Sequence, residues 1–145
     1  MKARTRARSI ALQALYEIDL TGHPVGVVLQ ERLNDEHLEP SVAEFAHQIV
    51  VGVWPVVAQL DQFIAAHAPD WPLDQVAIID RNIIRIALWE FAVDGKVPIK
   101  VAINEAVELA KIYGSDSTPR FVNGVLGSLA ARENEIRQAL KQFTK

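Results

Sequence analysis

The stretch PIKVAINEAVELAKIYGSDSTPRFVNGVLGSL, residues 98–129, predicts two amphipathic helices joined by a short polar turn. Apolar residues recur in both halves at the spacing of one helix face: Ile103, Val107 and Ala110, then Phe121, Val122, Val125, Leu126 and Leu129. Residues 114–119 between them are rich in glycine, serine and aspartate, which favour turns and helix caps. Because the connection is short, the two helices are expected to pack against each other.

The same helical period continues toward the N-terminus, and strand-like alternation is nearly absent. An apolar stripe covers residues 11–18, and Gly22 followed by Pro24 is expected to end this first helix. Pro24 also suits the first turn of a second helix. Ser41 and Glu44 form a predicted capping box at the start of a third.

A long apolar stripe then runs from Phe45 to about His67. Pro55 lies inside it, and proline removes a backbone hydrogen bond and crowds the preceding turn, so we expect a kink near Gly52–Trp54. Residues 68–72, APDWP, are the clearest linker in the chain.

This linker divides a predicted single domain, residues 1–145, into an N-terminal half of about 1–68 and a C-terminal half of about 72–145. The second half is expected to begin with a short helix from Leu73 to Ile79, followed by an amphipathic helix that Asp80 caps. The fold class predicted from these patterns is all-α, with about seven helices and no sheet.

Composition narrows the possible functions. Half of the 145 residues are apolar and 23% are charged, so the chain can bury a sizeable core. No run approaches the roughly 20 uninterrupted apolar residues of a membrane span, so we expect no membrane association. The absence of cysteine excludes disulfides and thiol chemistry and suits a cytoplasmic protein. The histidines are scattered without metal-ligand spacing, and no nucleophile elbow or phosphate-cradling loop occurs, so we expect no cofactor, metal or catalytic residue.

The N-terminus is the first candidate binding site. Lys2, Arg4, Arg6 and Arg8 carry +4 within a chain of net charge −3, which leaves −7 on the remainder. If this stretch is helical, Arg4 and Arg8 share one face while Arg6 points roughly the other way. Such guanidinium groups can clamp phosphates or stack on unpaired bases. A solvated, frayed terminus accounts for the charge equally well.

The polar turn is the second candidate. A turn with free amides at a helix start can hold an anion, and Arg120 and Phe121 follow it directly. A helix–turn–helix corner with Phe121 in the core is the simpler structural interpretation.

Three blocks of sequence resemble the NusB family. RTRARSIALQALYE (4–17) is similar to its opening pattern of arginines followed by A-x-Q-x-L-Y. DRNIIRIALWEF (80–91) resembles its middle segment, and KVAINEAVELAKIYGSDSTPRFVNGVL (100–126) resembles its most recognisable stretch. The blocks follow the family's order and spacing.

The resemblance implies an all-α fold of two packed small helical bundles. It also implies a partner, NusE, which is a ribosomal small-subunit protein that also acts in transcription. The pair is expected to bind the single-stranded boxA element of nascent RNA. With other Nus factors and RNA polymerase it suppresses premature termination, chiefly in ribosomal RNA operons.

The candidate site combines the positions that match the family with Lys2 and Phe121, which belong to the basic N-terminus and to the polar-turn region. The candidate RNA contacts are Lys2, Arg4, Arg6, Arg8, Ser115, Asp116, Ser117, Arg120 and Phe121. The positions of Tyr16 and Asp80 match those at or near the surface where the partner protein docks. An aromatic flanking the first core stripe remains open for Tyr16, and a simple helix cap remains open for Asp80.

Two other functions remain open from the sequence. The helical fold resembles the N-terminal domain of some ribosomal RNA cytosine methyltransferases, which would make the chain an RNA-recruiting module of an enzyme. Against this, no strand or glycine-rich loop of a methyl-donor domain is expected before Lys145. The second alternative is a scaffold that forms a homodimer through its interaction surface. The sequence does not decide whether the protein is a monomer or a homodimer.

Overall fold

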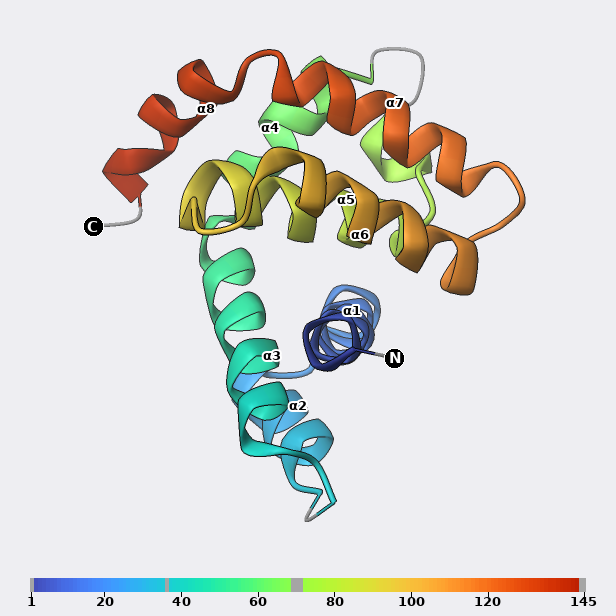
Figure 1. Ribbon diagram of the computed structural model, residues 1–145, viewed down its shortest axis with the longest axis vertical. Helices are drawn as coiled ribbons and strands as arrows, with labels where there is room; N and C mark the ends of the chain where they lie inside the picture. The colour runs from blue at the N-terminus through green and yellow to red at the C-terminus, as the bar shows by residue number, and fades with distance from the viewer. Residues whose placement is uncertain (1, 36, 69–71, 144–145) are drawn as a thin grey trace.

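The computed structural model describes residues 2–35, 37–68 and 72–143, and within them it contains helices and no strand (Figure 1). The predicted all-α fold is confirmed. The α-helices are α1 (Ala3–Thr21), α2 (Val25–Leu33), α3 (Pro40–Val53), α4 (Val57–Ala66), α5 (Ile78–Leu88), α6 (Ile99–Tyr113), α7 (Thr118–Ala130) and α8 (Glu133–Leu140). Shorter 3-10 or π segments are η1 (Trp54–Val56), η2 (Leu73–Gln75), η3 (Trp89–Asp94) and η4 (Lys141–Phe143).

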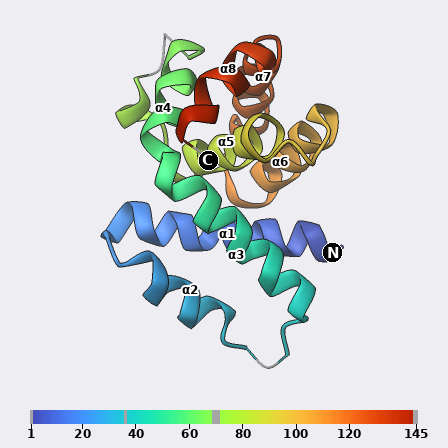
Figure 2. The same cartoon turned by 90° about the vertical axis from the view of Figure 1, so that its left-hand side faces the viewer.

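The helices form two groups that share one apolar core. In Figure 1, α1, α2 and α3 make the lower group, and α4 to α8 the upper group, with α1 seen end-on beneath α5 and α6. Figure 2 shows α1 lying crosswise behind α3. One cluster of buried side chains runs through both groups, with Leu15, Ile49, Ile84 and Leu126 as examples. The two predicted small bundles are therefore present and are fused by a common core.

Glycine ends two of these helices. Gly22 adopts φ 74° after α1 and its N–H donates to the carbonyl of Ile18 at 2.9 Å, and Gly95 adopts φ 72° after η3. Both values lie in the left-handed region that glycine enters without steric cost. The predicted end of the first helix is confirmed.

Pro55 breaks the longest apolar stretch, as predicted. α3 ends at Val53, and one 3-10 turn precedes α4. By length and composition Pro40–Ala66 could cross a membrane, with mean hydropathy 1.6 over an 18-residue window of which 33% is buried. However, the break divides it, and its core-facing side chains, such as Ile49 and Leu60, are fully buried in protein. We therefore assign both helices to the protein core.

Three local predictions were wrong. α3 begins at Pro40, whose fixed φ suits the first helical position, so Ser41 does not cap it. α5 begins at Ile78, which places Asp80 inside the first turn and not at the cap. The expected helix 73–79 is reduced to the single turn η2.

The boundary between the lower group of helices (α1 to α3) and the upper group (α4 to α8) lies at η1. α4 packs against α5 and α7, although the predicted N-terminal half included it. The predicted linker, 68–72, lies mostly outside the described residues.

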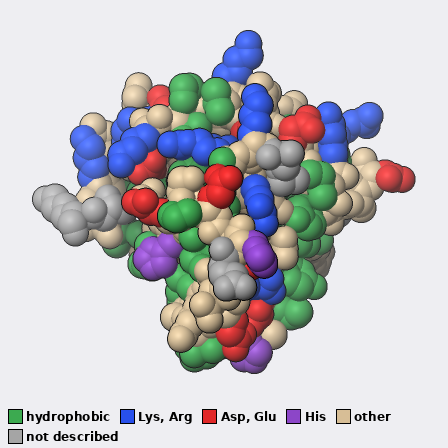
Figure 3. Space-filling view, turned by 60° about the horizontal axis from the view of Figure 1, so that its bottom comes forward, with side chains coloured by type: hydrophobic (Ala, Val, Ile, Leu, Met, Phe, Trp, Pro, Cys, Tyr) green, Lys and Arg blue, Asp and Glu red, His purple; other side chains and the backbone are tan. Residues whose placement is uncertain are grey.

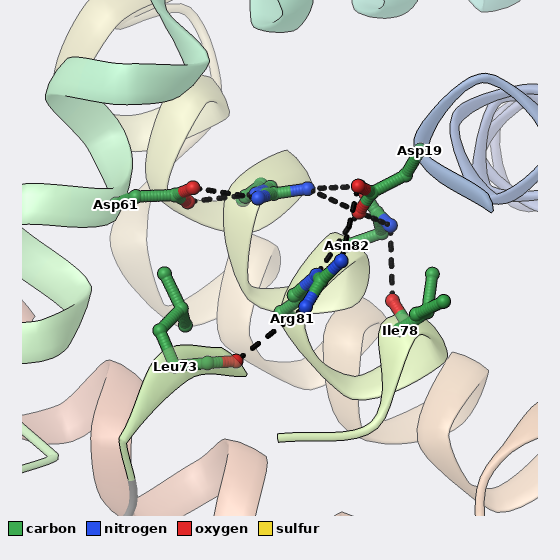
Figure 4. Close-up of polar contacts among 7 residues, drawn as sticks. Asp19, Asp61, Leu73, Ile78, Arg81 and Asn82 are labelled. Carbon is green, nitrogen blue, oxygen red and sulfur yellow. Dashed lines mark hydrogen bonds and ion pairs between the residues drawn. The ribbon is translucent and has the colours of Figure 1, made fainter. Parts of the chain in front are cut away.

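A partly buried polar network joins α1, α4 and α5 (Figure 4). Asp19, near the end of α1, accepts hydrogen bonds from Arg81, Asn82 and Arg85 at 2.7–3.0 Å. Arg85 also donates to Asp61 of α4 at 2.7 and 2.6 Å. Burial raises the pKa of Asp19, but the hydrogen bonds and positive charge of its partners outweigh burial and hold that pKa below its ordinary value. The network fixes the first turns of α5, which carry Asp80.

Candidate nucleic-acid interface

The start of α1 carries three exposed cations, Lys2, Arg4 and Arg6. The helix begins directly after Lys2, and its first turn contains no acidic residue. The N-terminal end of a helix carries a partial positive charge, so cations placed there destabilise the helix. A bound polyanion would relieve that repulsion, which makes this cluster a candidate phosphate-binding site.

Arg8 does not belong to the exposed cluster, and its predicted role as an RNA contact has to be corrected. Its side chain is only 3% exposed, and Glu90 is 1% exposed. The Arg8 Nε lies 3.0 and 3.1 Å from the two Glu90 carboxylate oxygens, and its Nη2 lies 2.8 Å from one of them. Glu105 adds a second carboxylate at 3.7 Å. The Arg8 charge is therefore used inside the protein.

Hydrogen bonds join α6 to α1 where the two helices cross, since α1 is seen end-on in Figure 1 and α6 runs across the view. Thr5 donates to Glu105 at 3.0 Å. About one and two turns further along α1, Ser9 and Gln13 both bond the hydroxyl of Tyr113, Gln13 at 3.1 Å. Because Tyr113 ends α6, this contact sets the polar turn beside the middle of α1.

The turn at residues 114–118 is organised by the hydroxyl of Thr118, a residue only 1% exposed. Its Oγ1 accepts from the Ser115 N–H at 2.9 Å. It donates to Asp80 of α5, with its oxygen 3.0 and 3.2 Å from the two carboxylate oxygens. Gly114 is needed here because a Cβ at that position would overlap the Thr118 side chain. Ser115, Asp116 and Ser117 remain exposed on the outside of the turn.

Two hollows flank Asp80. One, of about 320 Å³, is lined by Gln75, Val76, Ala77, Asp80, Ser117, Arg120 and Phe121. The other, of about 300 Å³, is lined by Tyr16, Ala77, Ile78, Ile79, Asp80, Tyr113, Gly114 and Ser115. Burial raises the pKa of Asp80, and the hydrogen bond from Thr118 offsets part of that rise. A half-buried carboxylate between two hollows suits a cationic or hydrogen-bond-donating partner group.

The structure thus brings the predicted residues together in two places. The two hollows are lined, among others, by Tyr16, Asp80, Ser115, Ser117, Arg120 and Phe121. Asp116 is exposed in the turn between Ser115 and Ser117, and Lys2, Arg4 and Arg6 lie at the start of α1. From Arg4 to Tyr16 along α1 the separation is about 18 Å at 1.5 Å per residue. Phe121 is partly buried and packs on the core while it also lines a hollow, so both of its predicted roles are compatible with its position.

Sequence reasoning missed Thr118, Glu90 and Phe45. Thr118 offered a weak signal as a hydroxyl residue at a helix start. Glu90 and Phe45 offered none, because each meets its arginine partners from a distant part of the chain.

Charge on the face turned toward the viewer in Figure 3 is mixed, with Lys and Arg side chains gathered over its upper part and acidic side chains among them. Within the described parts of the chain, no group of three His, Asp or Glu side chains is arranged to hold a metal ion.

Comparison with known proteins gives a consistent result. The model of the NusB family matches residues 5–131. The transcription antitermination protein NusB of Roseiflexus castenholzii is 49% identical over 134 residues, which cover 91% of this chain and 94% of that protein. The Bacillus subtilis protein of the same name is 43% identical over 139 residues, which cover 96% and 100%.

Solved structures agree with the sequence matches. T. maritima NusB superposes with a TM-score of 0.84 at 30% identity, covering 93% of this chain and 96% of that one. A chain from a complex of the antitermination factors NusB and NusE with double-stranded RNA gives 0.78 at 25% identity, covering 96% and 98%.

The fold and the cationic helix define a class of protein: all-α, built of two fused small bundles, with a candidate polyanion-binding surface. Within that class, the chain belongs to the NusB family.

Proposed function

We propose that this protein is a cytoplasmic, non-enzymatic transcription antitermination factor that binds boxA-type single-stranded RNA together with NusE. It acts with other Nus factors on RNA polymerase during transcription of ribosomal RNA operons. The observation that carries the proposal is the group of exposed cations at the start of α1 in a chain whose relatives are antitermination proteins.

The RNA surface begins at Lys2, Arg4 and Arg6, whose charges neutralise phosphates. It continues past the α1–α6 contact to the turn residues Ser115, Asp116 and Ser117, with Arg120 and Phe121 beside them. Hydroxyl groups and partly exposed rings there can contact unpaired bases. Arg8 is left out because its guanidinium is occupied by Glu90.

The partner surface lies around Asp80 and Tyr16. Both residues line the same hollow, and Asp80 is fixed from one side by Thr118 and from the other by the Asp19 network of α5. A rigid carboxylate beside an aromatic ring is suited to docking a folded protein, since little ordering is required on binding.

A fluorescence titration tests the proposal. Wild type should bind boxA RNA weakly alone, more tightly with NusE, and in preference to a scrambled sequence. The variant Lys2→Ala, Arg4→Ala and Arg6→Ala should lose affinity at least tenfold and show a smaller salt dependence, because fewer counterions are released.

The matched control removes three positive charges near α8, by Lys96→Ala, Arg132→Ala and Lys141→Ala. It should bind RNA as wild type does. Equal loss in both variants would mean that net charge alone drives binding and would contradict a specific surface on α1.

A further inference from the structure

Phe45 of α3 lies under the cationic start of α1. The guanidinium carbon of Arg4 is 4.6 Å from the centroid of its ring, and that of Arg8 is 5.3 Å away. Both distances are within the range of an attractive cation–π contact. Arg4 and Arg8 are one helical turn apart, so a single ring serves both residues.

The ring is held firmly in place. Phe45 is partly buried and packs against both apolar clusters of the protein, the large core and the small cluster of Ala7, Val42 and Ala46. The neighbouring Arg8 is fixed by Glu90. Phe45 therefore presents an ordered surface to the side chain of Arg4.

Arg4 differs from Arg8 in its exposure. It is exposed, and no described residue accepts a hydrogen bond from its guanidinium. A guanidinium that rests against an aromatic ring keeps its N–H groups available at the edge. The contact with Phe45 thus restrains Arg4 without using the donors that a phosphate or a base would need.

We propose that Phe45 is a positioning residue for RNA binding, which holds Arg4 ready to contact single-stranded RNA. The inference rests on the proposed function, because it takes Arg4 as an RNA contact. An exposed arginine normally loses rotamer freedom when it binds, and a side chain restrained beforehand loses less. Phe45 acts on RNA only through Arg4 and has no contact of its own to make.

The test measures RNA affinity for Phe45→Leu, which keeps an apolar side chain and removes the ring. We expect a loss of about two- to fivefold, the strength of an exposed cation–π contact. Phe45→Tyr, which restores a ring, should bind as wild type does. Phe63→Leu serves as the matched control, because Phe63 is also partly buried against the core, in α4.

A double-mutant cycle separates positioning from a structural effect. In an Arg4→Ala background, Phe45→Leu should cause no further loss of RNA affinity. If Phe45→Leu weakens binding equally with and without Arg4, the ring acts through general stability and the proposal is overturned. Arg4→Lys provides a second test, which leaves α3 unchanged because the substitution lies in α1. It keeps the positive charge and removes the planar guanidinium group. It should lower affinity by an amount similar to Phe45→Leu.

The RNA contact at Arg4 and the positioning role of Phe45 can be disproved separately. If Arg4→Ala weakens RNA binding and Phe45→Leu does not, the positioning role is wrong and the RNA surface stands. If Arg4→Ala has no effect on RNA binding, the proposed RNA contact at Arg4 is wrong and the positioning role falls with it.

Discussion

The hydroxyl of Thr118 bonds the carboxylate of Asp80 at 3.0 Å while it accepts the backbone N–H of Ser115 at 2.9 Å. One buried oxygen atom therefore joins the turn of the proposed RNA surface to the residue proposed to meet the partner protein. A change in either group alters the hydrogen bond available to the other.

Replacing Thr118 by Val should weaken NusE binding about fivefold, the equivalent of about 1 kcal/mol for one lost hydrogen bond. It should also raise the pKa of Asp80 further, because the hydrogen bond that now opposes the effect of burial is removed. Carboxyl NMR titration reports the pKa, and calorimetry with NusE reports the affinity. Thr118→Ser keeps the hydroxyl and should resemble wild type in both measurements.

Breaking the Arg8–Glu90 pair should be costly. Arg8→Met leaves a buried, unpaired carboxylate, and we expect a loss of about 3–5 kcal/mol in the free energy of unfolding. Urea unfolding measures it. The double change Arg8→Met and Glu90→Met should recover much of the loss. Arg132→Ala breaks an exposed pair with Glu135 and should change stability by less than about 1 kcal/mol. A mild effect of Arg8→Met would mean that Glu90 becomes protonated or hydrated once its partner is removed.

Asp19 should make the free energy of unfolding depend on pH in the acidic range. Its pKa in the folded protein lies below the ordinary value of 3.8. As the pH falls, Asp19 is therefore protonated in the unfolded chain before it is protonated in the folded protein. Its contribution to stability is fully present above the ordinary pKa of 3.8 and is lost as the pH drops through the lower pKa of the folded protein. Between about pH 5 and about pH 2, wild type should lose stability more steeply than Asp19→Asn.

The measurement is a series of urea unfolding curves at stepped pH. Asp74→Asn, at an exposed position, is the control and should follow the wild-type slope. Parallel curves for wild type and Asp19→Asn would show that the Asp19 network does not persist in solution.

Gly52 should tolerate no side chain. A Cβ there would overlap the indole ring of Trp89, so α3 and η3 approach through this glycine. Gly52→Ala should destabilise by about 1–3 kcal/mol, the usual cost of overpacking. Gly26→Ala has no neighbour within 4 Å and should stabilise α2 by about 0.5–1 kcal/mol. Thermal unfolding of both variants makes the comparison, and a stable Gly52→Ala protein would show that Trp89 can move aside.

Periodicity and helix-ending residues were sufficient to predict most of the fold. The stripe before Gly22 and the break at Pro55 are local signals, because each depends on a residue's own backbone preferences. The errors at Ser41 and Asp80 arose where tertiary contacts or a neighbouring proline determined the helix start. Asp80 bonds Thr118, and Pro40 occupies the first position of α3.

The site was predicted less completely for a related reason. The pattern of arginines correctly indicated a cationic helix, but it could not separate Arg4, which is exposed, from Arg8, which is buried. That difference depends on Glu90, which lies 82 residues away in sequence.

From Ala3 to Thr21, α1 is a single unbroken helix. It carries the cations at one end and Tyr16 further along, so the protein cannot vary the spacing between its two proposed contact areas. The helix would thus act as a ruler that holds the partner protein about 18 Å from the cations that bind RNA. A strand that touches both the cations and the docked partner has to span that distance, about five stacked nucleotides at 3.4 Å each. Extra nucleotides between those two contacts would have to bulge outward, whereas a shorter RNA could reach only one of them.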